Sequence, residues 1–242
     1  MKSAGIKEAS ACSFVKNMDD GALRCALLIQ LYRVRLLATS SVGLIIFLGL
    51  LLVNVRNPNN RVDHFIWNLF VNERESWANT AIERFTSAFN TLPDIVYAVV
   101  VIIVIGWWRR SWWPLLTIGL SMVLSSGAMA IIKNILDRER PPLVDRLVEE
   151  TSFSFPSGHS TGIAALCLSV FLASYAALER KTRWILGIFL TILALAVACS
   201  RLYVGVHWGS DVLAGLTLGG RLPVAWSMRF SRRGCLLAGN RT

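Results

Sequence analysis

The sequence predicts an all-α fold, a polytopic membrane bundle of about six transmembrane helices, and three observations support this class. Of the 242 residues, 54% are hydrophobic, the mean hydropathy is +0.52 and only 17% are charged. The charged residues gather between apolar stretches, several of which approach or exceed the roughly 18 to 20 residues that a helix needs to cross a bilayer. No repeat or low-complexity tract indicates a second domain.

Apolar runs predict where the six spans lie. We place them at residues 37–54, 92–108, 112–132, 158–178, 184–200 and 208–228. The turn WWRRSWW between the second and third spans has the tryptophans and arginines that are typical of a membrane interface. In the sixth span Arg221 and Pro223 interrupt the apolar run, and the Arg221 side chain is expected to extend to the cytoplasmic side.

These spans divide the chain into three parts. Residues 1–36 form an N-terminal segment and a candidate interfacial helix, residues 37–228 form the six-span domain, and residues 229–242 form a basic tail. Between the first two spans, residues 62–89 have apolar side chains at helical spacing with charges between them, which predicts one or two amphipathic helices. Such helices either pack on the bundle as a lid or guide the substrate.

The distribution of charge predicts the orientation. The side with both termini and the 109–110 and 179–183 turns has 16 basic and four acidic residues, whereas the opposite side has nine basic and 11 acidic residues. By the positive-inside rule the first side is cytoplasmic, so residues 133–157 and 201–211 face outward. The net charge of +10 then reflects topology, and nucleic acid is not an expected partner.

The five cysteines form no CxxC pair, and they predict neither a disulfide framework nor a zinc site. They are Cys12, Cys25, Cys167, Cys199 and Cys235.

Polar residues gather in three clusters on the predicted outer side, where ionisable groups near a membrane often mark function. In KNILDRERP, Lys133 ends a span and Arg140 follows two helical turns later. Taken alone, this cluster also fits an ordinary interfacial anchor.

The second cluster is FPSGHST, in which Ser157 is a favourable N-cap for the apolar helix that follows. The free N–H groups of that helix start, with Gly158 and no side chain in the way, suit an anion, and His159 stands in the first turn. A simple helix cap explains this cluster equally well when it is taken alone.

The third cluster, SRLYVGVHWGSD, contains Arg201 at the end of the fifth span, and His207 and Asp211 at i, i+4 spacing on one helix face. A carboxylate bonded to one imidazole nitrogen leaves the other nitrogen with its lone pair, as an oriented nucleophile or base requires. In isolation the pair also fits a helix-capping ion pair.

Together the clusters indicate a phosphate site. The rival use of two histidines and a carboxylate is a metal centre, but Lys133, Arg140 and Arg201 would repel a cation, and guanidinium groups match phosphate oxygens. The sequence therefore predicts no metal and no cofactor.

The three motifs resemble the signature of the type-2 phosphatidic acid phosphatase superfamily, also called lipid phosphate phosphatases. The parts K-x6-RP, PSGH and SR-x5-H-x3-D are all intact and in order, beginning at Lys133, Pro156 and Ser200. The resemblance implies that His207 is the nucleophile that forms a phosphohistidine, that Asp211 orients it, and that His159 protonates the leaving oxygen and then activates water. It also implies a set of phosphate-binding groups: Lys133, Arg140, Ser157, Gly158 and Arg201.

The expected function is thus metal-independent hydrolysis of a lipid phosphate or diphosphate at the outer face of the cell membrane. The compact chain resembles bacterial members, which act on undecaprenyl diphosphate, phosphatidylglycerol phosphate or phosphatidate, and we slightly favour the first. Two alternatives stay open: a transferase that uses the same phosphohistidine, and a non-catalytic membrane protein that binds phosphate. The expected partners are the lipid substrate and the bilayer, and the sequence does not determine the oligomeric state.

Overall fold

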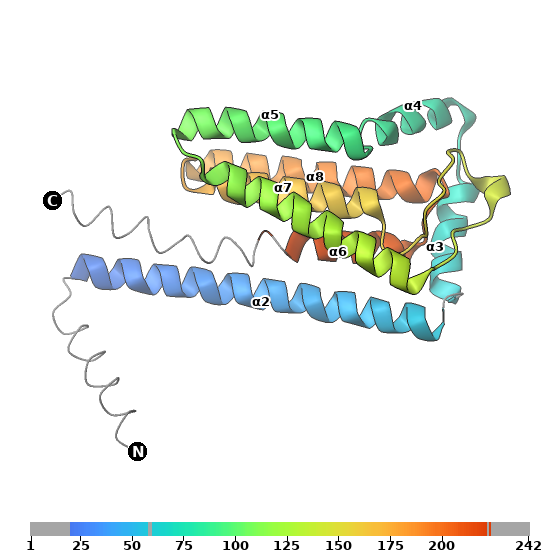
Figure 1. The fold of residues 1–242 in the computed structure, drawn as a ribbon, viewed down its shortest axis with the longest axis horizontal. Helices are drawn as coiled ribbons and strands as arrows, with labels where there is room; N and C mark the ends of the chain where they lie inside the picture. The colour runs from blue at the N-terminus through green and yellow to red at the C-terminus, as the bar shows by residue number, and fades with distance from the viewer. Residues whose placement is uncertain (1–19, 58–59, 222, 224–242) are drawn as a thin grey trace, which may run out of the picture.

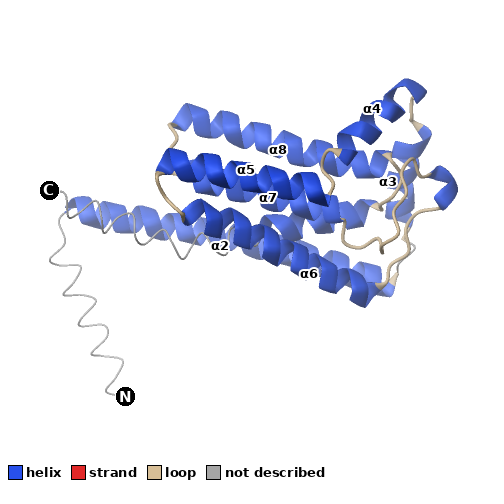
Figure 2. Ribbon diagram, turned by 45° about the horizontal axis from the view of Figure 1, so that its top comes forward, coloured by secondary structure: helices blue, strands red, loops and turns tan. Residues whose placement is uncertain are grey.

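The computed structural model describes residues 20–57, 60–221 and 223, and this part of the chain consists of helices and loops without a strand (Figure 2). Helix α2, Asp20–Arg56, is followed by two short helices, α3 at Arg61–Asn72 and α4 at Ser76–Ser87. The long helices after them are α5 at Thr91–Arg109, α6 at Leu120–Leu136, α7 at Gly158–Tyr175 and α8 at Arg180–Tyr203. A π-helical turn, Leu115–Gly119, precedes α6, a 3-10 turn occupies Leu143–Asp145, and residues 209–221 are helical.

Five described helices are long and apolar enough to cross a membrane, and they confirm the first five predicted spans and the multi-pass class. They are Ala38–Arg56, Thr91–Arg109, Leu115–Leu136, Gly158–Tyr175 and Arg180–Tyr203. The sixth predicted span, residues 208–228, lies partly outside the described residues, and its described part is helical over 209–221. The predicted tail, residues 229–242, lies wholly outside them.

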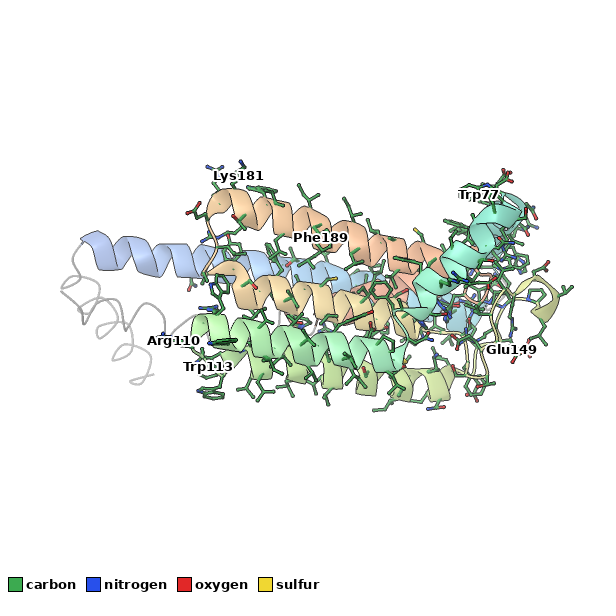
Figure 3. The ribbon with its side chains drawn as sticks, turned by 90° about the horizontal axis from the view of Figure 1, so that it is seen from above. Trp77, Arg110, Trp113, Glu149, Lys181 and Phe189 are labelled. Atoms are coloured by element: carbon green, nitrogen blue, oxygen red, sulfur yellow. The ribbon has the colours of Figure 1, made fainter. Side chains whose placement is uncertain are left out.

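The outside of the bundle is apolar at mid-height, as a hydrocarbon environment requires. Ile103 and Phe189 are 60% and 59% exposed, as side chains that face lipid would be. Figure 3 places Phe189 along α8, between an end marked by Trp113 and Lys181 and an end marked by Trp77. Aromatic and charged residues at the two ends match the interfaces of a membrane.

Helix α2 continues across the boundary that the sequence predicted at residue 36. The sequence predicted a separate N-terminal segment, but α2 runs without a break from Asp20 to Arg56, and Figure 1 shows it extending beyond the bundle at its N-terminal end. No glycine or proline occurs between Gly21 and Gly43, so nothing in the sequence interrupts the helix. Its 37 residues measure about 55 Å at 1.5 Å per residue, which exceeds the hydrocarbon core of a bilayer.

The predicted amphipathic segment forms the two helices α3 and α4, which cover one end of the bundle (Figure 1). Asn60 caps α3 because its Oδ1 accepts a hydrogen bond from the Asp63 N–H at 2.9 Å. Both helices contact α8, and the buried Trp67 donates its Nε1–H to the Gly205 carbonyl at 3.3 Å. The segment is therefore packed against the helix ends, as a lid would be.

Helix α7 is the centre of the bundle, with 56% of its span buried against 11% to 28% for the other four spans. The helical residues 209–221 approach it closely through two glycines. A Cβ on Gly215 would lie 2.6 Å from the Ser157 carbonyl oxygen, and a Cβ on Gly219 would collide with the Thr161 carbonyl. Small residues at this four-residue spacing let two helix backbones meet, which brings Asp211 beside the start of α7.

We expect Gly219→Ala to lower stability because the added methyl has no room against Thr161. Overpacking of this kind costs about 1 to 3 kcal/mol. Gly127→Ala is the matched control, since a Cβ there meets nothing within 4 Å and removes backbone freedom from the unfolded chain. Thermal unfolding of the detergent-solubilised variants measures the difference, and a melting temperature for Gly219→Ala at or above that of Gly127→Ala would contradict the packing.

Candidate active site

The three polar clusters meet at the α3 end of the bundle, where loop segments lie side by side. The Ser154 N–H donates to the Arg138 carbonyl at 2.8 Å, and the Ser157 N–H donates to the Asp211 carbonyl at 3.0 Å. Arg140 Nη1 donates to the Val206 carbonyl at 2.9 Å. These bonds join the segment after α6, the segment before α7 and the segment after α8, so the predicted residues come together in one site.

His207 and Asp211 are both buried and lie next to each other. The His207 Nδ1 is 3.5 Å from Asp211 Oδ2, and its Nε2 is 3.2 Å from Arg140 Nη1. Asp211 Oδ2 is held by the Ser154 hydroxyl at 2.5 Å and by the Trp208 N–H at 2.9 Å. The 3.5 Å separation is long for a hydrogen bond, and contacts of this kind often tighten only when substrate is bound.

The surroundings of the His207 imidazole favour its neutral form. Burial lowers its pKa well below the ordinary value of 6.5, and the positive charges of Arg140, Arg201 and Lys133 lower the pKa further. With Arg140 donating toward Nε2 and a carboxylate near Nδ1, the proton belongs on Nδ1. Nε2 then has the lone pair that a nucleophile needs.

Lys133 and Arg140 converge on Ser152, in the loop that leads to α7. Lys133 Nζ donates to the Ser152 hydroxyl at 3.2 Å, and Arg140 donates to the same hydroxyl at 3.1 Å and to the Ser152 carbonyl at 2.6 Å. The two helical turns expected from the spacing are wrong, because α6 ends at Leu136 and Arg140 lies in the loop after it. The two cations come together indirectly, through Ser152.

Arg201 is almost fully buried, at 1% exposure, in the last turn of α8. Its Nη1 donates to Thr86 Oγ1 at 2.9 Å, and its Nη2 pairs with Glu150 Oε1 at 2.5 Å. The second oxygen of Glu150 lies 3.5 Å from Arg140 Nη2. A carboxylate thus bridges the two arginines, in an arrangement that suits the oxygens of a phosphate equally well. Arg201 Nε is buried and has no hydrogen-bond partner among the residues that the structure describes, which leaves a further donor at this position.

The start of α7 forms as the sequence predicted. Ser157 is the N-cap and accepts a hydrogen bond from the Ser160 N–H, and Gly158 is the first helical residue. Because the first amides of a helix have no intrahelical acceptor, the Gly158 and His159 N–H groups at this helix start suit an anion. His159 is half-buried, and its Nε2 lies 2.8 Å from Asn90 Oδ1, just before α5.

Several residues that support the site were not predicted from the sequence. Thr86, Asn90 and Glu150 hold predicted site residues but lie in no motif, and nothing in the local pattern marks them. For Asp63 and Arg138, the sequence contains a weak indication of a supporting role. Asp63 lies four residues before Trp67 on the face of α3 that is buried, where an acidic residue needs a partner, and Arg138 stands within the first motif.

The arrangement suits a small anion with several oxygens. Three cationic side chains, those of Lys133, Arg140 and Arg201, lie around the His207 imidazole and the start of α7. Fixed positive charge of this kind stabilises a bound anion. It also stabilises negative charge that develops in the transition state of a reaction, most strongly where water is excluded. Among the described residues, no three His, Cys, Asp or Glu side chains are grouped so that they could hold a metal ion.

Comparisons with known proteins identify the family of this chain. The family model described as the PAP2 superfamily matches residues 114–234, a range that contains all three motifs. Phosphatidylglycerophosphatase B of Bacillus subtilis is 32% identical over 172 residues, which cover 67% of this chain and 80% of the relative. An undecaprenyl-diphosphatase of Sulfolobus acidocaldarius is 35% identical over 109 residues, and the match covers 43% of this chain and 49% of that protein.

The fold is also similar to a solved structure. The crystal structure described as a transmembrane PAP2 type phosphatidylglycerolphosphate phosphatase from Bacillus subtilis superposes with a TM-score of 0.70 and 28% sequence identity. The superposition covers 79% of this chain and 96% of the other.

Because Glu150 occupies the position between Arg140 and Arg201, we expect Glu150→Gln to bind a phosphate-like anion more tightly. Removing the competing negative charge should lower the dissociation constant for orthovanadate by about tenfold, which corresponds to about 1.4 kcal/mol. The matched control is Glu149→Gln, which removes the same charge from the exposed neighbouring position (Figure 3). Titration of purified protein with orthovanadate, followed by thermal shift, measures both. Equal affinity in the two variants would show that Glu150 does not compete with the anion.

Proposed function

The chain belongs to the PAP2 superfamily, and we propose that it is a membrane phosphatase that hydrolyses lipid phosphates through a phosphohistidine on His207. The proposal rests mainly on one observation, the buried imidazole of His207 between Asp211 and the cation Arg140. Anion binding alone does not require an oriented imidazole, whereas phosphoryl transfer to nitrogen does.

In the first step, His207 Nε2 attacks phosphorus and the bond from phosphorus to the lipid oxygen breaks. His159 donates a proton to that leaving oxygen, so the lipid departs as an alcohol or, from a diphosphate, as a monophosphate. Asp211 stabilises the positive charge that develops on the His207 ring, because its carboxylate lies against the Nδ1 side.

In the second step, water attacks the phosphohistidine. His159 takes a proton from the water, the nitrogen–phosphorus bond breaks, and phosphate leaves with His207 restored. The contact of His159 with Asn90 Oδ1 supports this role because it orients the ring in the absence of substrate.

The phosphoryl group would take the place that Glu150 occupies. Lys133, Arg140 and Arg201 would neutralise the nonbridging oxygens, and Ser157 and the Gly158 N–H would bind them at the start of α7. Phosphoryl transfer is catalysed mainly by such positioning and charge stabilisation. The Glu150 carboxylate must therefore withdraw when substrate binds.

We propose that the site opens on the outer face of the membrane, with both termini in the cytoplasm. The excess of basic residues on the opposite end of the bundle supports this orientation. A lipid in the outer leaflet could then keep its chain in the bilayer while its phosphate reaches the helix ends. The named relatives suggest phosphatidylglycerol phosphate and undecaprenyl diphosphate as first substrates to test.

Labelling with a radioactive phosphate donor should identify the nucleophile. We expect the unmodified protein to form an acid-labile, base-stable phosphoprotein, and His207→Ala to form none and lose phosphate release. His159→Gln should still acquire the label on His207, but both the formation and the hydrolysis of the label should be slower. The His159 variant is the matched control because it also removes a histidine from the site. Label on the His207 variant would show that another residue is the nucleophile.

Phosphate release from a panel of lipid phosphates and diphosphates should identify the substrate class. We expect activity to persist fully in excess chelator, since the proposed chemistry uses only side chains and water. Adding a lipid alcohol as acceptor distinguishes hydrolysis from transfer: free phosphate as the main product supports a phosphatase, whereas phosphorylated acceptor as the main product would indicate a transferase. Loss of activity in chelator would argue for a metal.

A further inference from the structure

A chain of buried ion pairs runs from α3 to the His207 imidazole. Asp211 turns Oδ2 toward His207, and its Oδ1 accepts a hydrogen bond from Arg138 Nη1 at 2.5 Å. Arg138 Nη2 is bonded in turn to Asp63 Oδ2 at 2.7 Å. The side chains of Asp63, Arg138 and Asp211 are at most 3% exposed, so water screens these interactions very little.

We propose that Asp63 is a positioning residue for the reaction, acting on His207 through Arg138 and Asp211, and that this is how α3 contributes to the site. The inference rests on the proposed function. It assigns a role to a residue of the amphipathic segment that touches neither the nucleophile nor the groups proposed to bind phosphate.

The charge balance is the first reason. A buried carboxylate needs a counter-charge, and Arg138 supplies one to Asp211. Arg138 alone would cancel the negative charge that Asp211 must present to His207. With Asp63 on the other arm of the guanidinium, the group of three has a net charge of −1, so Asp211 can still stabilise a positively charged His207 ring.

The orientation of Arg138 is the second reason. The planar guanidinium binds one carboxylate with each terminal nitrogen, a geometry that lysine cannot reproduce. Ser210 closes the arrangement, because its N–H and hydroxyl donate to Asp63 at 2.7 and 2.6 Å and its oxygen accepts from Arg138 Nη1 at 2.8 Å. The Arg138 guanidinium also lies 5.7 Å from the centre of the Trp208 ring, beside His207.

The contacts of Asp63 predict that loss of its charge lowers the turnover rate and leaves substrate binding nearly unchanged. Its carboxylate is bonded to Arg138, Ser210 and Asn60, none of which is a proposed phosphate ligand. Asp63→Asn keeps the shape and removes the charge. We therefore expect kcat to fall roughly 10- to 100-fold, as when residues that orient a catalytic group are removed, while KM stays within about threefold.

The matched control is Glu73→Gln, which removes a negative charge from an exposed position just after α3. It should keep the kcat and KM of the unmodified protein. Phosphate release with a lipid phosphate measures both variants. If Asp63→Asn is as active as Glu73→Gln, the inference is wrong, whereas an unmodified protein without phosphatase activity would defeat the proposed function itself.

A double-mutant comparison separates positioning from general destabilisation. In an Asp211→Asn background, Asp63→Asn should reduce the single-turnover rate less than about threefold, because its effect passes through the Asp211 charge. The same fold loss in both backgrounds would overturn the inference. Should Asp63→Asn fail to purify as a folded protein, Arg138→Lys, which keeps the charge but not the fork, is judged by the same kcat and KM criteria.

Discussion

The ion pair between Arg138 and Asp211 is the contact on which the rest of the site depends. It is buried at the end of a membrane bundle, where an uncompensated charge costs several kcal/mol. The pair therefore holds the segment after α6 against the segment after α8. Through Asp63 it also holds α3 in place, and through the second Asp211 oxygen it fixes Ser154 and the Trp208 N–H. The need to pair these buried charges thus holds four parts of the chain together.

The positively charged part of the site must offset the repulsion among its own cationic side chains. Lys133, Arg140 and Arg201 lie close together, and their mutual repulsion would favour opening of the loops. Glu150 offsets that repulsion by bridging the two arginines, and Thr86 accepts from Arg201 on the other side. The site therefore holds its cations in place before the phosphate arrives, at the cost of a carboxylate that the phosphate must displace.

Much of the site could be predicted because its motifs are local. Asp211 follows His207 by four residues across the start of the helix at 209–221, and Ser157 caps the helix that begins at Gly158, so these contacts lie within short stretches of sequence. The supporting residues could not be predicted in this way. Asp63 lies 75 residues from Arg138, and Thr86 lies 115 residues from Arg201, and no periodic pattern encodes contacts of that range.

By itself, the sequence determined the all-α membrane class, the first five spans and the three motifs, because apolar length and short spacings are properties of the chain alone. Tertiary structure decided how the motifs meet. The close approach at Gly215 and Gly219, the packing of α3 and α4 on the helix ends, and the ion pairs that follow all depend on contacts between distant segments. The continuity of α2 through residue 36 was also decided there. Burial selects these pairings, since each buried charge is stable only beside the partner that the fold brings to it.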